Sequence, residues 1–349
     1  MELTNEQRKY FGLELIEPGW DRVELPEKNI LFFDGDILRK VIRMGDNGHF
    51  CESSYALRTQ DNRTKIAPLT ERGKPKLLNA VNIQRCTPYG MYFDYNGEIL
   101  IANYTTQQTY YSSAFAGVPY IEQNDFQDFL DDWIAGTTDK DLDEIQAFVR
   151  MKRRRVKYKE GDFFRFRYDR RYYGYGRILF DVQKFVKDGG KFWDILMGKP
   201  LCVSVYHIVT ETPDISIEDL QKIKSCPSAY MMDNRFFYGE YEIIGNAPLS
   251  EHEDYPIMYG RSISALDRDK ICFCRGREYR EIPLKGNALL PEDFKNNRIG
   301  WSLNVYKPLV EACIKADSNE PFWEVNRRND LRNPAFSKEL AIVLKQMGL

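Results

Sequence analysis

The chain has 349 residues, a formal net charge of −2 and 14% aromatic residues. This length exceeds the size of about 250–300 residues at which one hydrophobic core stops growing, and the aromatic content excludes a disordered chain. The charge excludes a global attraction to nucleic acid or to an anionic membrane. The sequence contains no apolar run of the about 18 residues that cross a membrane, and its start, MELTNEQRKY, lacks the features of a signal peptide. We therefore expect a cytoplasmic protein with two domains and no membrane partner.

The first 120 residues are predicted to form paired strands after a short helix with Thr4 at its N-cap. Asp34-Gly35 and Asn96-Gly97 each lie between two apolar runs. Such dipeptides adopt the positive φ angles of tight hairpin turns. We therefore expect a β-hairpin around each of these two turns.

The apolar period changes from two to about 3.6 in the next segment, which predicts two helices in an antiparallel hairpin that ends the first domain. This hairpin is strongly acidic, because residues 120–149 include nine acids and one lysine. The first of the two helices carries Asp128, Asp131 and Asp132 beside its apolar stripe. An acidic surface of this kind is suited to a basic protein partner.

We expect two β-rich domains, an amino-terminal one over residues 1–152 and a second over residues 153–349, and an α+β fold class. The strands expected in the second domain lie around 162–168, 173–182, 201–209, 236–244, 257–264 and 271–282. Helices are expected around 217–224, 303–316 and 337–347. This order predicts a strongly bent antiparallel sheet or a small barrel with peripheral helices.

No catalytic constellation, cofactor motif or metal-ligand spacing is found in the sequence. Its three histidines are His49, His207 and His252, and no two of them have ligand spacing, so a metal site would have to be assembled from distant segments. The seven cysteines are expected to be reduced thiols, with Cys272 and Cys274 in the core of a strand. We therefore predict no catalytic residue, no cofactor and no bound metal.

The Gly174-Tyr175-Gly176 segment is also not a phosphate-binding loop. The position of the third fingerprint glycine is taken by Leu179, and the segment leads into a strand rather than a helix. Glycines in a strand mark a bend or a close approach of neighbouring groups, which is the interpretation we favour. A ligand groove bordered by tyrosines is the alternative.

A basic segment follows the acidic hairpin. Residues 150–177 contain 12 Lys or Arg and three acids, interleaved with aromatic residues, a pattern that can bind single-stranded nucleic acid. The preceding acidic block nearly cancels this charge, so pairing between the two blocks, or simple solvation, is favoured. A nucleic-acid-binding module using residues 150–177 and an enzyme with an unrecognised site remain as alternatives.

Three short motifs carry a resemblance to a known family. They are GDFF at residues 161–164, YGYGR at 173–177 and the apolar strand ILFDV at 178–182. This passage resembles the start of the bacterial immunity protein 26 family, in which Gly-Asp and aromatic residues lead through a short turn into a Tyr-Gly-x-Gly-Arg strand. The resemblance extends to about residue 285 and leaves residues 1–150 without a family.

The resemblance implies a mostly β protein that is encoded beside a polymorphic toxin and neutralises that toxin by binding and occlusion, without catalysis. Many toxins that attack nucleic acids are basic because they hold phosphate, so the inhibitor is expected to present acids to its partner. We therefore expect Asp128, Asp131 and Asp132 to face a basic protein toxin.

A second placement of the toxin contact uses the face with Tyr172, Tyr173, Tyr175 and Arg177, because Tyr and Arg often dominate the energetics of interfaces. The alternative for these side chains is cross-strand packing that stabilises the sheet, which we favour.

Overall fold

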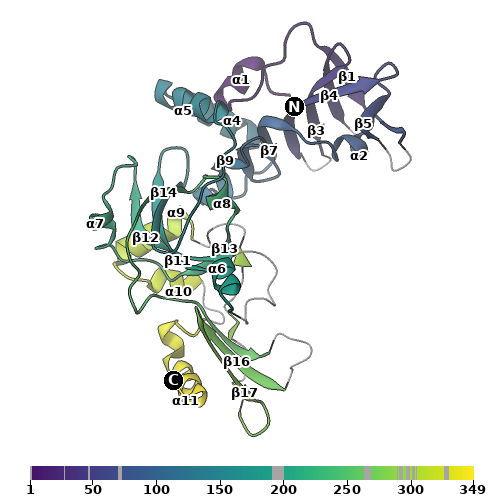
Figure 1. The fold of residues 1–349 in the computed structure, drawn as a ribbon. Helices are drawn as coiled ribbons and strands as arrows, with labels where there is room; N and C mark the ends of the chain where they lie inside the picture. The colour runs from purple at the N-terminus through teal and green to yellow at the C-terminus, as the bar shows by residue number, and fades with distance from the viewer. Residues whose placement is uncertain are drawn as a thin grey trace. The chain divides into compact units, whose positions relative to one another are not determined.

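The computed structural model describes residues 2–26, 28–45, 48–69, 73–190, 200–262, 269–288, 290, 294–295, 299–300, 303, 305–325 and 330–349. The chain forms two compact units, unit 1 over Met1–Arg154 and unit 2 over Arg155–Leu349 (Figure 1). Both units are mixed α and β with mostly antiparallel sheets, which confirms the α+β class and the two β-rich parts predicted from the sequence.

Unit 1 is built on one nine-stranded sheet in the order β1-β2-β3-β4-β7-β8-β9, with β5 paired to β4 and β6 paired to β5. Its strands are β1 Asp21–Leu25, β2 Asn29–Asp34, β3 Ile37–Met44, β4 Phe50–Gln60, β5 Lys65–Leu69, β6 Pro75–Leu77, β7 Tyr89–Tyr95, β8 Ile99–Asn103 and β9 Gln108–Ser112. Its helices are α1 Asn5–Tyr10, α2 Ala80–Ile83, α3 Ser113–Ala116, α4 Phe126–Ala135 and α5 Asp139–Val149.

Both predicted hairpins of unit 1 are present. The β2–β3 turn places Gly35 at a φ of 56°, and the β7–β8 turn places Gly97 at a φ of 74°. These are left-handed conformations that glycine adopts without steric cost. Thr4 caps α1 as expected, because its hydroxyl accepts from the backbone N–H of Gln7 at 3.2 Å.

The helices α4 and α5 bury one side in the main core of unit 1. Phe126, Leu130 and Trp133 of α4 belong to a cluster that also contains Ile145 of α5. The Phe126 ring stacks on that of Tyr95 with centroids 4.0 Å apart. The other side of each helix is therefore free to carry the acidic residues.

Unit 2 contains a six-stranded sheet in the order β14-β10-β11-β12-β13-β19 and a four-stranded sheet in the order β17-β16-β15-β18. Its strands are β10 Asp162–Arg167, β11 Tyr173–Asp181, β12 Pro200–Thr210, β13 Ala229–Met232, β14 Glu242–Asn246, β15 Ile257–Arg261, β16 Lys270–Arg275, β17 Glu278–Pro283, β18 Phe294–Lys295 and β19 Ile299–Gly300. Its helices are α6 Val182–Lys187, α7 Ile217–Leu220, α8 Asn234–Phe237, α9 Lys307–Ala316, α10 Glu320–Val325 and α11 Ser337–Met347.

The described strands of unit 2 form open sheets and do not close into a barrel. Of the two predicted alternatives, the sheet is therefore the one observed. Irregular register interrupts the pairing of β10 with β14 and of β11 with β12. Bulges of this kind bend a strand and increase its twist. Two predicted strands have different bounds, because residues 236–244 begin with α8 and residues 271–282 form the hairpin of β16 and β17.

Candidate partner-binding surfaces

The three aspartates predicted to face a partner lie on the solvent-exposed side of α4. Asp128, Asp131 and Asp132 are all exposed, and their spacing of three and four residues places them on one side of the helix. Asp131 accepts a hydrogen bond from Nε2 of Gln127 at 2.9 Å. In the described chain no Lys or Arg lies within salt-bridge distance of the three carboxylates, so their charge is available to a partner.

A large exposed aromatic side chain precedes this helix. Tyr120 is 65% exposed, although a Cβ atom at Gly97 would lie only 1.8 Å from its ring. The next residue, Ile121, is buried and donates its backbone N–H to the carbonyl of Gly97 at 2.8 Å. One face of the Tyr120 ring therefore packs on Gly97 in the β7–β8 turn, and the rest of the Tyr120 side chain faces solvent.

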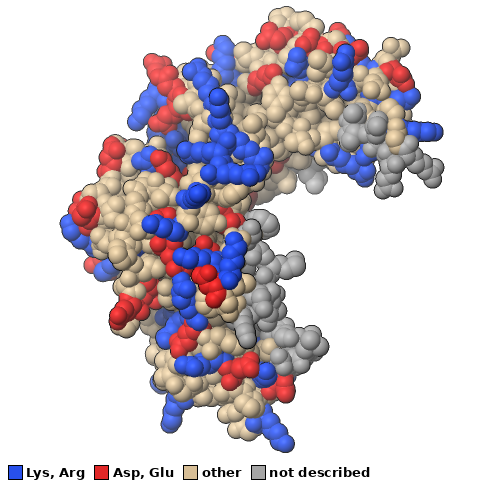
Figure 2. All heavy atoms as spheres, in the orientation of Figure 1, with Lys and Arg blue, Asp and Glu red and all other residues tan. Residues whose placement is uncertain are grey.

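Tyr120 was not singled out in the sequence. A lone tyrosine in the segment Val118–Ile121 gives no periodic signal, and its position depends on the turn at Gly97, more than 20 residues earlier. Figure 2 shows Lys and Arg beside Asp and Glu on the visible face of each unit. We define the acidic surface as Asp128, Asp131 and Asp132 of α4 together with Tyr120, which precedes this helix in the sequence.

Tyr175 and Arg177 lie inside unit 2. Tyr175 is fully buried, and its hydroxyl is 2.9 Å from Oγ1 of Thr210. Arg177 is 9% exposed and donates to the backbone carbonyls of Ala247 and Pro248, each at 2.7 Å. Both side chains hold unit 2 together through these hydrogen bonds, which agrees with the favoured, structural interpretation of this face.

Tyr172 and Tyr173 are half-buried and reach the surface. The Lys307 ammonium lies 3.6 Å from the centroid of the Tyr172 ring. The guanidinium carbon of Arg167 lies 5.3 Å from the centroid of the Tyr173 ring. Each ring is thus held in place by a cation and remains a candidate for contact with a partner.

The two glycines of β11 do not leave a groove. Gly176 pairs with Phe164, and Gly174 pairs with Phe166. A Cβ atom at Gly176 would lie 2.4 Å from both the Phe164 ring and the backbone oxygen of Ser204, and one at Gly174 would lie 2.1 Å from the Tyr168 ring. The rings occupy the space that the missing side chains leave, as the favoured interpretation expected.

The basic segment divides into an exposed run and a part that is used within unit 2. Residues 151–159 form no helix or strand, and the side chains at 150, 152–155, 157 and 159 are exposed. Arg165 instead donates from Nε and Nη2 to one carboxylate oxygen of Glu242, at 3.0 and 2.8 Å. With Arg177 also buried, the surface available to a nucleic acid is smaller than the sequence suggested.

A pocket of about 480 Å³ lies in unit 1 beside the start of β4. Its lining includes His49, whose Nε2 is 2.8 Å from Oδ1 of Asp94, and Cys51, two residues further along β4. Burial raises the pKa of the Cys51 thiol. This direction is opposite to the lowered pKa of an activated, nucleophilic cysteine.

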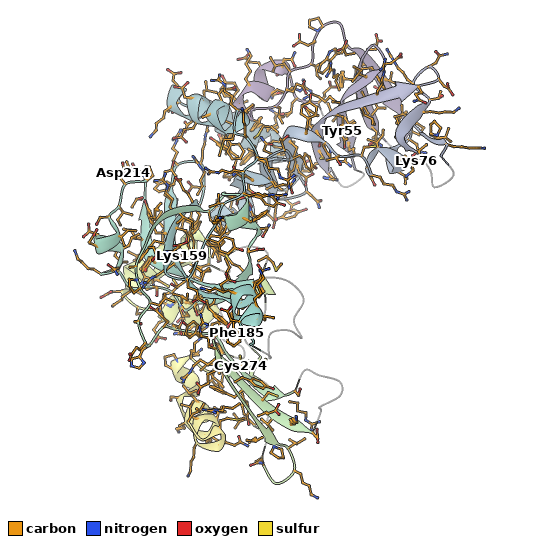
Figure 3. The ribbon with its side chains drawn as sticks, in the orientation of Figure 1. Tyr55, Lys76, Lys159, Phe185, Asp214 and Cys274 are labelled. Carbon is orange, nitrogen blue, oxygen red and sulfur yellow. The ribbon has the colours of Figure 1, made fainter. Side chains whose placement is uncertain are left out.

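The two cysteines predicted to be core residues are buried, with exposures of 2% for Cys272 and 3% for Cys274. Cys274 and Phe185, both labelled in Figure 3, pack in one apolar cluster. Burial raises the pKa of Cys274 to about 12. This cysteine is therefore a packing residue, as predicted.

Residues 159–271 match the family model Immunity protein 26. The matched segment contains all three motifs that carried the resemblance and lies in unit 2. The suspected family of the second domain is thus confirmed, and this family is one of immunity proteins. No curated protein and no solved structure matches the chain. Among the described helices, none is both long and apolar enough to span a membrane.

Proposed function

We propose that this chain is an immunity protein that binds a cognate protein toxin in the cytoplasm and neutralises it by covering the surface with which the toxin acts, without catalysis. The observation that carries the proposal is the match of residues 159–271 to the Immunity protein 26 family.

The acidic surface of unit 1 is proposed as one contact with the toxin. Three neighbouring carboxylates without a cation attract a basic partner over several ångströms and speed its association. Tyr120 adds a large, amphipathic side chain of the type that often anchors an interface. The combination of steering charges with an aromatic anchor is what an inhibitor of a basic toxin requires.

The test is to express the chain with the toxin encoded beside it, measure co-purification, and then compare variants. The triple charge reversal Asp128→Lys, Asp131→Lys and Asp132→Lys is expected to slow association about tenfold or more at low salt. The difference from the unaltered chain should shrink as salt screens the charges. Tyr120→Ala is expected to weaken binding by about 2 kcal/mol, mainly through faster dissociation.

The matched control reverses three exposed acids outside the acidic surface and outside residues 159–271, namely Glu17, Asp36 and Glu324. It changes the net charge equally and should leave association unchanged. If the control slows association as much as the test variant, the acidic surface is not the contact. If the neighbouring toxin neither binds the chain nor is neutralised by it, the proposed function itself is rejected.

A further inference from the structure

Three metal-ligating side chains that are far apart in the sequence meet inside unit 2. One ligand atom each from His207, Cys226 and Cys313 lies within 4.8 Å of the other two, and all three residues are buried. No pair of these residues has a recognisable ligand spacing. The family match covers His207 and Cys226 but ends before Cys313.

The backbone of β12 brings the first two side chains together. The N–H of His207 donates to the carbonyl of Lys224, and the N–H of Cys226 donates to the carbonyl of Val205, both at 2.8 Å. This antiparallel bridge pairs Tyr206 with Ser225. Residues on either side of a bridged pair share a face of the sheet, so His207 and Cys226 emerge on the same side.

The helix α9 supplies the third side chain. Leu309, Val310 and Cys313 form its buried face. The end of this helix is held to the same segment, because Nζ of Lys224 donates to the carboxylate and the backbone carbonyl of Asp317 at 2.7 and 2.9 Å. Cys313 is therefore fixed opposite the pair on β12 and its neighbouring segment.

The orientation of the imidazole is fixed by a second amide. Nε2 of His207 lies 2.7 Å from Oδ1 of Asn319, whose Nδ2 donates to the carbonyl of Ser225 at 3.1 Å. Since the Asn319 oxygen can only accept, the imidazole donates to it and keeps a lone pair on its other nitrogen. A hydrogen bond to one ring nitrogen is the usual support of a histidine that ligates a metal through the other.

We propose that His207, Cys226 and Cys313 bind one zinc ion. Two thiolates and one imidazole are a set that favours tetrahedral zinc. With zinc–sulfur and zinc–nitrogen bonds of about 2.3 and 2.0 Å, neighbouring ligand atoms lie about 3.4–3.8 Å apart. Since the ligand atoms now lie within 4.8 Å of one another, the three side chains need to approach by at most about 1.4 Å. The fourth position goes to a water molecule.

Other buried cysteines of unit 2 are packed among apolar side chains. Cys202 and Cys274 lie in a hydrophobic cluster with Leu179, Phe180 and Met258. Only at His207, Cys226 and Cys313 do three such groups meet in the described residues. The ion would join β12, the segment at Cys226 and α9, so it stabilises unit 2 and is independent of the toxin contact proposed above.

The test uses the full chain, purified with reductant, and measures bound zinc by plasma mass spectrometry and cobalt(II) binding by absorption. One zinc per chain is expected, and cobalt should give thiolate charge-transfer bands and strong tetrahedral d–d bands. Cys226→Ala and Cys313→Ala should lose these bands. The matched controls Cys272→Ala and Cys274→Ala, which also remove a buried thiol from unit 2, should keep them.

Two further measurements do not depend on variants that lack a ligand. Zinc should raise the thermal midpoint of the unaltered chain, and a chelator should lower it again. Asn319→Ala should weaken zinc binding by about 10- to 100-fold while keeping one ion per chain. The proposal is overturned if the unaltered chain binds no zinc at micromolar concentration, if cobalt gives no thiolate bands, or if the control variants lose the bands equally.

Discussion

Single residues explain why the motif of β11 has its particular sequence. The glycines at 174 and 176 are required because the rings of Phe164 and Tyr168 lie where their side chains would be. The sequence indicated a bend or a close approach at these positions. It did not indicate which groups approach, because the partners come from β10 and β12.

Gly176→Ala is expected to destabilise unit 2 by about 1–3 kcal/mol, the usual cost of overpacking a core. The new Cβ would meet the backbone oxygen of Ser204 at 2.4 Å, which cannot move as a side chain does. Urea denaturation followed by circular dichroism measures this loss. Gly19→Ala is the control, since nothing lies within 4 Å of that position; an equal loss there would contradict the explanation.

A buried cluster of three charged residues in unit 1 was not predicted from the sequence. The Glu52 carboxylate accepts hydrogen bonds from Nε and Nη2 of Arg8 at 2.8 and 3.1 Å. Its Oε1 also accepts from Nζ of Lys40 at 2.6 Å. All three residues are at most 2% exposed. Their contacts span 44 and 12 positions in the sequence, so no local pattern could indicate them.

Glu52→Gln is expected to destabilise the protein by about 3–5 kcal/mol, because it removes the counter-charge of the buried Lys40 and leaves Arg8 only the more distant Glu2 at 3.8 Å. Lys40→Met should cost clearly less, since Arg8 still pairs with Glu52. Denaturant unfolding at pH 7 compares the two variants. Equal losses would show that Arg8 alone does not neutralise Glu52.

The buried pair of Lys40 and Glu52 makes the free energy of unfolding depend on pH. Burial lowers the pKa of Lys40 from its usual 10.5, so the folded chain gives up this proton at a lower pH than the unfolded chain. Between those two pKa values the unfolded state binds more protons, and stability rises with pH. The free energy of unfolding of the unaltered chain should therefore rise relative to Lys40→Met as the pH approaches 10.5; a constant difference would contradict the lowered pKa.

At the scale of elements, the sequence predicted a helix correctly where an apolar stripe and a capping residue occur together. The helical hairpin of α4 and α5 was predicted from its apolar stripe, and Thr138 caps α5 in a capping box with Asp141. The other helix, α4, begins at Phe126, and its N-cap Asp125 makes no side-chain capping hydrogen bond. A cap depends on backbone angles that composition does not determine.

Two predicted strands are interrupted at glycines, so their bounds differ from those expected. Gly276 has a φ of 58° and turns the run 271–282 into the β16–β17 hairpin. Gly239 has a φ of 71° and separates α8 from β14. The sequence could have indicated both breaks, since glycine favours positive φ. The meeting of His207, Cys226 and Cys313 had no such signal, because it depends on how α9 packs on β12.

At the scale of the whole molecule, five hydrophobic clusters among the described residues each lie within one of the two compact units. The clusters around Phe93 and around Tyr55 contain only residues of unit 1, whereas those around Phe180, Tyr259 and Tyr175 contain only residues of unit 2. Each unit thus has apolar cores of its own. We therefore predict that each unit folds on its own.

Limited proteolysis tests that prediction. The run at 150–157 is exposed, rich in Lys and Arg, and without a helix or strand from residue 151, so trypsin is expected to release an amino-terminal fragment that ends within it. If each unit folds on its own, both fragments should keep their circular dichroism and resist further digestion. Replacing the six basic residues at 150, 152–155 and 157 by Gln should remove this cut. Should the two fragments be degraded together, or should the amino-terminal product end elsewhere, the units would be parts of one cooperative domain.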